Sequence, residues 1–256
     1  ATSLGVTFEK EAAIEKINIH KSNVASLTVN GITHKFDYVV SGADYHHTET
    51  LLLPEYRNYK DSYWKKKVMA PSALLFYVGF DKKIKNVLHH TLFFDESFTE
   101  HAVEIYDTPK WPKKPLFYAS FPSITEPELA PDTTKETAIF LIPIAPDLVD
   151  TNETRNSYFE MIIGRLESLT GQDLRGDVLF KESYCVNDFK DDYNSFKGNA
   201  YGLANTLMQT AFLRPKLQSK KVKNLYYTGQ LTVPGPGVPP ALISGKLVAD
   251  LILKKD

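Results

Sequence analysis

Residues 224–246 read NLYYTGQLTVPGPGVPPALISGK, and this stretch decides how the ends of the chain are interpreted. Its first part, Leu225 to Thr228, is apolar and typical of a short buried strand. Gly229 follows, and because glycine has no side chain the backbone there can approach another group closely. The next prolines and glycines predict an irregular loop, and Pro239 and Pro240 predict a helix start. Together these signals predict a ligand cradle, with an ordinary structural turn as the alternative.

The helix that begins near Pro239 is expected to have two kinds of surface. One face carries apolar or small residues, and the opposite stripe is polar. The first consists of Leu242, Gly245, Ala249 and Ile252, and the second of Lys246, Asp250 and Lys254. Free N–H groups and the positive end of the helix dipole are expected at Val238 and beyond, where they suit an electron-rich ligand atom.

The N-terminal region predicts strands. Ala13 to Ile19 and Val24 to Val29 read as two strands, and Asn30-Gly31 predicts a two-residue hairpin turn. Residues 36–40 (FDYVV) form a nearly continuous apolar run that ends at residues 41–44 (SGAD). Such a run predicts a strand buried on both faces, whose carboxyl end meets a ligand or another backbone. A simple tight turn is the alternative.

The middle of the chain is rich in short β-branched or aromatic segments, which predict a mostly antiparallel sheet. The expected strands are residues 72–80, 91–94, 116–121 and 137–144. A helix is expected after them, with Asp150 and Glu153 as a capping pair and Gly171 as its C-terminal stop.

We therefore predict a mixed α/β (α+β) fold. Both chain ends form the remainder of a Rossmann-like nucleotide-binding domain, and a mostly antiparallel sheet is inserted between them. The expected boundaries are residues 1–52 and 206–256 for the nucleotide-binding parts and 53–205 for the inserted substrate domain.

Composition excludes several classes of protein. The 30 basic and 31 acidic residues give a net charge of −1, so no broad field favours nucleic acid. The basic runs Lys65–Lys67 and Lys220–Lys221 are interpreted as solvated surface. A single cysteine, Cys185, excludes an internal disulfide and a CxxC metal site, which favours a cytoplasmic protein. No apolar run reaches the ~20 residues of a membrane span, so any membrane contact is expected to be peripheral.

Several motifs resemble one family. Residues 227–240 (YTGQLTVPGPGVPP) resemble the C-terminal FAD-binding signature of bacterial phytoene and carotenoid desaturases, which belong to the flavoprotein superfamily that includes amine oxidases. Residues 36–44, 89–94 and 196–202 resemble further segments of the same family, and the likeness runs from about Gly5 to the end. The opening residues read as the middle of a fold and no GxGxxG occurs, so we expect a C-terminal fragment.

The resemblance implies FAD as cofactor and assigns residues to it. Gly229 and Gln230 would lie beside the ribityl and pyrophosphate, and the helix start would face the flavin ring. The implied ring contacts are Gly237, Val238 and Pro239; Ile14 would contact adenine through its backbone, and Ala43 and Asp44 would close the nucleotide site.

The resemblance also implies a function. It predicts desaturation of a carotenoid such as phytoene or γ-carotene, with a hydride passing to flavin N5 and electrons leaving to a quinone or oxygen. The expected partners are a carotenoid and a lipid surface. Alternatives are a non-catalytic carotenoid- or lipid-binding module, a carotenoid isomerase and an amine oxidase.

Two histidine pairs were considered as metal or acid–base sites. Adjacent residues of a strand point to opposite faces, so His89-His90 is not expected to chelate a metal, and neither is His46-His47 unless that pair lies in a turn. His90 is retained as the candidate catalytic side chain. Ser244 and Ser195 lack the turn that a nucleophilic serine requires.

Overall fold

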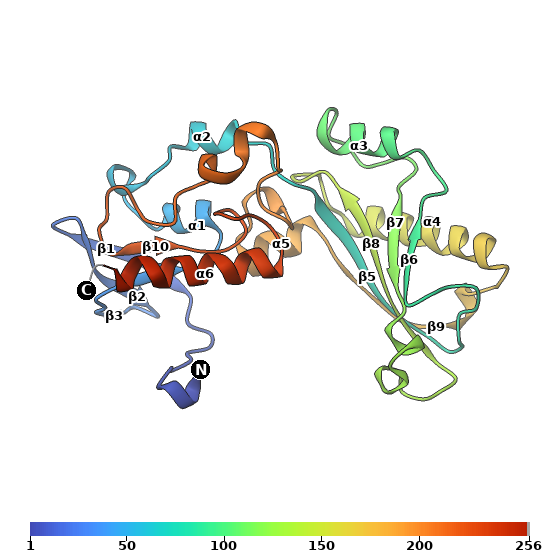
Figure 1. Ribbon diagram of the computed structural model, residues 1–256. Helices are drawn as coiled ribbons and strands as arrows, with labels where there is room; N and C mark the ends of the chain where they lie inside the picture. Colours follow the sequence, from blue (N-terminus) through green and yellow to red (C-terminus); the bar gives the residue numbers. More distant parts are fainter. Residues whose placement is uncertain (255–256) are drawn as a thin grey trace. The chain divides into compact units, whose positions relative to one another are not determined.

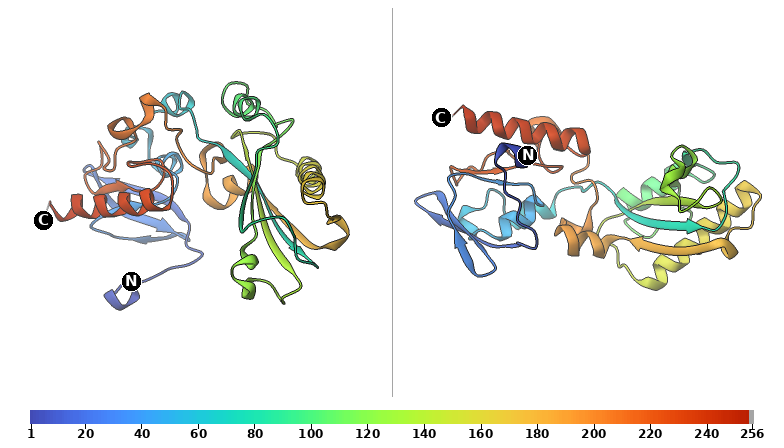
Figure 2. Two further views of the ribbon diagram at one scale, coloured as in Figure 1. Left: turned by 45° about the vertical axis from the view of Figure 1, so that its right-hand side comes forward. Right: turned by 90° about the horizontal axis from the view of Figure 1, so that it is seen from below.

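The computed structural model describes residues 1–254, and its elements are shown in Figures 1 and 2. The chain forms two compact units. The first combines residues 1–67 with the C-terminal residues from Asn205 onward, and the second is Val68–Ala204. The mixed α/β class and the construction of one unit from both chain ends agree with the sequence prediction.

The first boundary follows Lys67 rather than residue 52, where the sequence had placed it. The reason is a buried carboxylate on α1 (Tyr45–Thr50). Glu49 accepts hydrogen bonds from the backbone N–H groups of Asn58 (2.6 Å) and Tyr59 (3.1 Å). Residues 53–67, including α2 (Asp61–Lys65), are thereby held in the first unit.

Strands β1 (Ile14–His20), β2 (Asn23–Val29) and β3 (Ile32–His34) form an antiparallel sheet in that order. The predicted hairpin turn is confirmed, because Asn30 and Gly31 have φ values of 48° and 73° and Val29 pairs with Ile32. A type I′ turn needs positive φ at both central residues, and Asn-Gly supplies it at low cost.

Strands β4 (Val39–Ser41) and β10 (Leu225–Tyr227) form a separate parallel pair. The expectation of a long strand buried on both faces over residues 36–40 is wrong. β4 has three residues and pairs with β10 in a two-stranded sheet, and the side chain of Val40 is 47% exposed. The neighbouring apolar side chains of Phe36 and Tyr38 are also exposed.

One amide joins these elements. The side chain of Asn224, just before β10, accepts a hydrogen bond from the N–H of Val24 (2.7 Å) and donates to its carbonyl oxygen (3.1 Å). The same amide donates to the carbonyl oxygen of Asp37 (2.8 Å). Asn224 therefore ties β2, the approach to β4 and β10 together.

The C-terminal helix α6 (Val238–Leu253) begins where predicted, but its orientation differs from the expectation. Ser244 and Val248 are its buried residues, whereas Leu242 of the expected buried face is 72% exposed and no atom lies within 4 Å of a Cβ placed on Gly245. A serine hydrogen bond, described below, decides which side of the helix faces inward.

The second unit is built on a five-stranded antiparallel sheet with the order β6-β7-β8-β5-β9. The strands are β5 (Ser72–Phe80), β6 (His90–Phe93), β7 (Phe117–Ser120), β8 (Glu136–Ile144) and β9 (Val178–Tyr184). Four were predicted; β9 was missed because charged residues interrupt its alternation. α3 (Phe98–Tyr106) and α5 (Val186–Tyr193) complete the unit, together with α4.

Helix α4 (Asn152–Thr170) contributes to one hydrophobic core with the sheet. Phe76 and Phe140, on neighbouring strands, share this core with Ile162 and Leu166 of the helix. Gly171 ends α4 in the left-handed conformation, as predicted (φ 70°). The first and last residues of the unit lie side by side. The N–H of Ala70 donates to the carbonyl oxygen of Gly202 (2.8 Å), and the N–H of Ala204 donates to the carbonyl oxygen of Val68 (3.0 Å).

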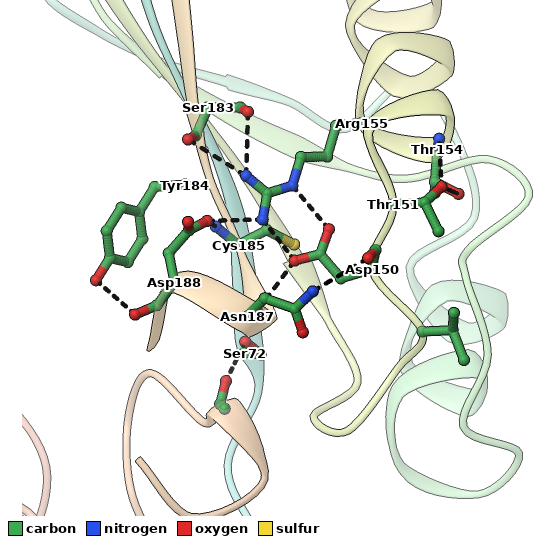
Figure 3. A network of polar contacts seen from close by, with 12 residues as sticks. Ser72, Asp150, Thr151, Thr154, Arg155, Ser183, Tyr184, Cys185, Asn187 and Asp188 are labelled. Carbon is green, nitrogen blue, oxygen red and sulfur yellow. Dashed lines mark hydrogen bonds and ion pairs between the residues drawn. The ribbon is translucent and has the colours of Figure 1, made fainter. Parts of the chain in front are cut away.

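The expected capping role of Asp150 is wrong, because Thr151 caps α4 by accepting from the N–H of Thr154 (3.2 Å). Asp150 instead holds the guanidinium of Arg155 through two bonds of 2.7 and 2.6 Å. Figure 3 shows this guanidinium also reaching Asp188 (2.7 Å). Burial raises the pKa of the nearby Cys185 thiol to about 12, so this cluster holds no reactive thiolate.

We predict that Arg155→Met lowers the free energy of unfolding by about 3–5 kcal/mol, because it leaves the buried Asp150 carboxylate without its partner. Chemical denaturation measures the change. Arg175→Met is the control: Arg175 is 53% exposed and pairs with Glu160 and Glu167, so its loss is expected to cost less than about 1 kcal/mol. Equal effects in the two variants would contradict a structural role for this network.

Candidate functional site

The carboxyl ends of β4 and β10 lie side by side because the two strands are parallel and in register, with Ser41 opposite Tyr227. The N–H of Thr228 donates to the carbonyl oxygen of Ser41 (2.9 Å). A Cβ placed on Gly229 would stand 3.8 Å from the carbonyl oxygen of Gly42. In open α/β sheets ligands bind outside such strand ends, so this edge is the candidate site.

Gly229 is also fixed to the C-terminal helix. It has a φ of 95°, and its N–H donates to the hydroxyl of Ser244 (2.9 Å). That hydroxyl donates in turn to the carbonyl oxygen of Ala241 (2.6 Å). Ser244 is fully buried, so it joins the end of β10 to α6. Sequence analysis considered Ser244 only as a nucleophile and missed this role, which spacing alone does not reveal.

A buried guanidinium group supports the loop between Gly229 and α6. Arg214 is 1% exposed and donates to the carbonyl oxygen of Gln230 (3.2 Å) and to the side-chain oxygen of Asn205 (2.5 Å). A Cβ on Gly235 would approach the guanidinium carbon of Arg214 to 3.2 Å, so this glycine makes room for the cation. Sequence analysis did not predict Arg214, because nothing in the local pattern marks a buried arginine.

The start of α6 is open to solvent. Gly237, with φ 108°, Val238 and Pro239 are all exposed, and Val238 is 75% exposed. Prolines 239 and 240 have no N–H, and the N–H of Ala241 bonds to the carbonyl oxygen of Gly237 (3.0 Å). Within residues 238–241 the backbone N–H of the exposed residue Val238 is therefore the group left for a ligand, and this is fewer donors than the sequence analysis had expected.

The other predicted residues are distributed over the fold. Ala43 is exposed beside the strand ends, and Asp44 caps α1 by accepting from the N–H of His47 (3.1 Å). Ile14 opens β1 in the separate three-stranded sheet. His90 belongs to the second unit. The structure thus brings Ala43 and Asp44 to the edge that carries Gly229 and Gln230, and gives no such placement for Ile14.

A cluster of buried aromatic rings lies directly behind this edge. Tyr227, the last residue of β10, stacks on Tyr45 with ring centroids 3.8 Å apart. Trp64 packs against Tyr45 at 5.7 Å, and all three rings are about 1% exposed. Burial raises the pKa of Glu49, which lies among them, to about 7 despite its hydrogen bonds from Asn58 and Tyr59.

The second unit carries a different candidate surface, on the sheet face opposite the α4 core. Alternation places Leu74, Phe76 and Val78 in the core at 0–1% exposure, whereas Tyr77 on the other face is 41% exposed. Residues on this face pair with one another on neighbouring strands, so the face extends across all five strands. The residues of one row are Leu92, Tyr118, Leu141, Leu75 and Tyr184. We call it the open sheet face.

His90 lies on the open sheet face, where its Nδ1 is 2.6 Å from the hydroxyl of Tyr118. The argument that His89 and His90 point to opposite faces is wrong, because His89 precedes β6 and the two rings lie 4.2 Å apart. Even so, among residues 1–254 no group of three His, Cys, Asp or Glu side chains is arranged to hold a metal ion.

Comparison with known proteins identifies the family. Residues 1–253 match the family described as flavin containing amine oxidoreductase. The chain belongs to this family. The resemblance stated from the motifs is thereby confirmed, and the cofactor is FAD, which this amine oxidoreductase family uses.

Individual relatives are carotenoid enzymes by name. The chain is 42% identical over 252 residues to "Carotenoid 3,4-desaturase" of Haloarcula japonica, covering 98% of the chain and 51% of that protein. It is 31% identical over 263 residues to "4,4'-diapophytoene desaturase (4,4'-diaponeurosporene-forming)" of Staphylococcus haemolyticus, covering 98% and 52%. The chain thus spans about half the length of these relatives.

The fold has a counterpart among solved structures. An oxidoreductase from Methanosarcina mazei superposes with a TM-score of 0.60 at 16% identity, over 93% of this chain and 49% of that one. At this identity the likeness concerns the fold alone.

The residues at the strand edge fit FAD by shape and by polarity. Gly42, Gly229 and Gly237 present backbone without side chains, and the exposed residue Val238 has its N–H at a helix start. The prediction that Gly229, Gln230, Gly237, Val238 and Pro239 contact the cofactor remains a prediction.

We predict that Glu49 makes stability fall as pH rises. Its pKa is about 7 in the folded chain and 4.5 ordinarily, so between these values the folded state binds more protons than the unfolded one. Stability from this group is complete below pH 4.5 and lost above pH 7, by on the order of 3 kcal/mol. Chemical denaturation at a series of pH values across this range measures the free energy of unfolding and checks the prediction.

The control is Glu49→Gln, which removes the titration. Burial lowers the pKa of His46 and His101, and this adds an opposite slope in both proteins. The difference between wild type and variant cancels that slope. A difference that does not change with pH would show that Glu49 does not titrate as its burial implies.

We further predict that Gly237→Leu abolishes flavin retention in the whole protein, because an exposed helix start would then carry a branched side chain at φ 108°. Visible flavin absorption after gel filtration measures retention. Gly171→Leu, also at a positive φ (70°), controls for backbone strain and is expected to keep its flavin. Flavin retained equally by both variants would refute the placement.

Proposed function

We propose that the whole protein is an FAD-dependent carotenoid desaturase working at a membrane surface. The observation that supports this most is the open start of α6 beside the parallel strand ends, which suits a flavin. The desaturase names of two relatives, one 42% identical, support the choice of chemistry within the family.

The open sheet face supports an apolar substrate. A carotene has no ionisable group, so a protein can recognise it only by shape, burial and orientation. Leu92 and Phe180 on this face are 64% and 53% exposed, and Tyr77 is 41% exposed, which is costly unless an apolar partner covers them. We assign this face to the polyene.

In the proposed reaction one carbon loses a hydrogen with its electron pair as a hydride, the neighbouring carbon loses a proton that is released to solvent, and a double bond forms between the two carbons. Bound FAD would supply the acceptor for a hydride at N5, and a quinone or oxygen would take the electrons onward. The N–H of Val238 and the dipole of α6 favour negative charge at the helix start without needing a side-chain base. The chain would otherwise orient the substrate and exclude water.

Membrane contact in this proposal is peripheral. Among residues 1–254, no helix has both the length and the hydropathy that spanning a bilayer demands. The proposed substrate dissolves in the bilayer, so the enzyme must reach it from the surface.

The deciding experiment is product analysis. Whole protein with FAD is incubated with phytoene or γ-carotene in liposomes, and the products are separated by chromatography with absorption spectra. New conjugated double bonds that depend on FAD support the proposal. Bound substrate that returns unchanged would instead indicate a non-catalytic carotenoid-binding module, and rearranged geometry without added double bonds would indicate an isomerase.

We predict that Leu92→Asp, on the open sheet face, lowers turnover at least about tenfold, because a bound polyene would cover this now exposed position and bury the carboxylate without a partner. The matched control is Leu179→Asp, at a site on β9 that is 54% exposed. Initial rates with phytoene measure both. Equal rates in the two variants would remove the open sheet face as the substrate surface.

A further inference from the structure

Basic side chains concentrate in two segments of the first unit that are far apart in sequence. Residues 206–230 contain five basic and no acidic residues, and residues 53–67 contain five basic and two acidic ones. Together they carry a formal charge of +8, whereas the rest of the chain carries −9. The near-zero net charge of the whole chain therefore hides a strong separation of charge.

The fold joins these two segments. The backbone N–H of Lys220 donates to the side chain of Asn58 (2.8 Å), and that of Lys216 donates to the hydroxyl of Tyr59 (3.2 Å). The Nζ of Lys221 donates to the carbonyl oxygen of Glu55 (2.9 Å). Figures 1 and 2 show α2 beside the segment that precedes β10.

Two stacked tyrosines hold the basic runs at one surface. The rings of Tyr59 and Tyr63 lie 4.2 Å apart. Lys220 Nζ lies 4.8 Å from the centroid of Tyr59, and Lys67 Nζ lies 4.6 Å from that of Tyr63. Cation–π contacts thus bind one lysine of each run to the same aromatic pair. The sequence analysis interpreted both runs as solvated surface, and the structure adds that they meet at one pair of aromatic rings.

Exposed apolar side chains adjoin this basic surface. Leu207, Met208 and Phe212 are 86%, 69% and 77% exposed, on two short 3-10 turns (Leu207–Gln209 and Ala211–Leu213). These turns are anchored, because the buried Arg214 follows them and the Nζ of Lys216 donates to the carbonyl oxygen of Phe212 (3.1 Å). Large apolar side chains held rigidly in water are unfavourable and mark an interaction surface.

We propose that this surface docks onto a bilayer containing anionic lipids. Leu207, Met208 and Phe212 enter the interface between headgroups and acyl chains. The flanking lysines, including Lys216, Lys220 and Lys221, face the lipid phosphates. Apolar side chains bordered by cations are the combination that surface-bound proteins use on anionic membranes. The inference deepens the membrane contact of the proposed function and does not depend on the chemistry at the flavin.

Vesicle flotation of the whole protein tests this inference without substrate. Vesicles are phosphatidylcholine alone or with about one third phosphatidylglycerol. We expect stronger binding to the anionic vesicles, and weaker binding as salt rises from about 0.1 M to about 1 M. The triple variant Lys216→Gln, Lys220→Gln, Lys221→Gln is expected to bind about 100-fold more weakly, since each lysine near a charged membrane contributes about 1 kcal/mol.

Matched controls separate docking from general effects. Neutralising Lys10, Lys16 and Lys35, which are exposed in the same unit, is expected to change binding less than about threefold. Leu207→Ser with Phe212→Ser is expected to weaken binding at least about tenfold, and Leu88→Ser with Val149→Ser to leave it unchanged, although Leu88 and Val149 are 74% and 79% exposed.

The inference is overturned if wild type stays in the soluble fraction, if both lysine triples bind alike, or if single-stranded nucleic acid is bound more tightly than anionic vesicles at equal salt. Desaturation of detergent-dispersed carotene is assayed alongside. Normal desaturation with failed flotation would refute the docking surface alone, and normal flotation without desaturation would refute the proposed chemistry alone.

Discussion

The amide of Asn224 is the interaction on which the candidate site depends. Its three hydrogen bonds reach backbone groups 200 and 187 positions away in the sequence. A net hydrogen bond is worth only about 1 kcal/mol, but leaving the two backbone groups of the buried Val24 unsatisfied would cost more. The pairing of β4 with β10 follows from this junction, and with it the meeting of Gly42 and Gly229. Two segments that are each too short to form a sheet alone are thereby aligned.

Sequence reasoning succeeded where a local rule acts. Asn30-Gly31, Gly171 and the start of α6 were predictable, because backbone conformation at those places depends on the residues themselves. It failed where contacts between residues far apart in the sequence determine the local structure. The inward side of α6 is set by the hydrogen bond from Gly229 to Ser244, and the boundary after Lys67 is set by Glu49 binding two backbone N–H groups. Arg214 supports a loop that begins 15 or more positions later, so no periodicity points to it.

The two units offer surfaces of different chemical character. The first unit offers backbone atoms, glycines and a helix start, which are suited to a polar cofactor. The second offers a sheet face of leucine and aromatic side chains, which is suited to a ligand without charges. Charge is separated in a similar way, since the excess of lysine lies in two segments of the first unit.

The entry and exit of the second unit are hydrogen-bonded to each other, through Ala70 with Gly202 and Val68 with Ala204. Because these hydrogen bonds hold its first and last residues together, the second unit can gain, lose or change residues in its strands without altering the distance between the points where the chain enters and leaves it. Under the proposed function, the surface assigned to the substrate could therefore change in evolution while the unit assigned to the flavin is kept, and one scaffold could then act on different hydrophobic molecules.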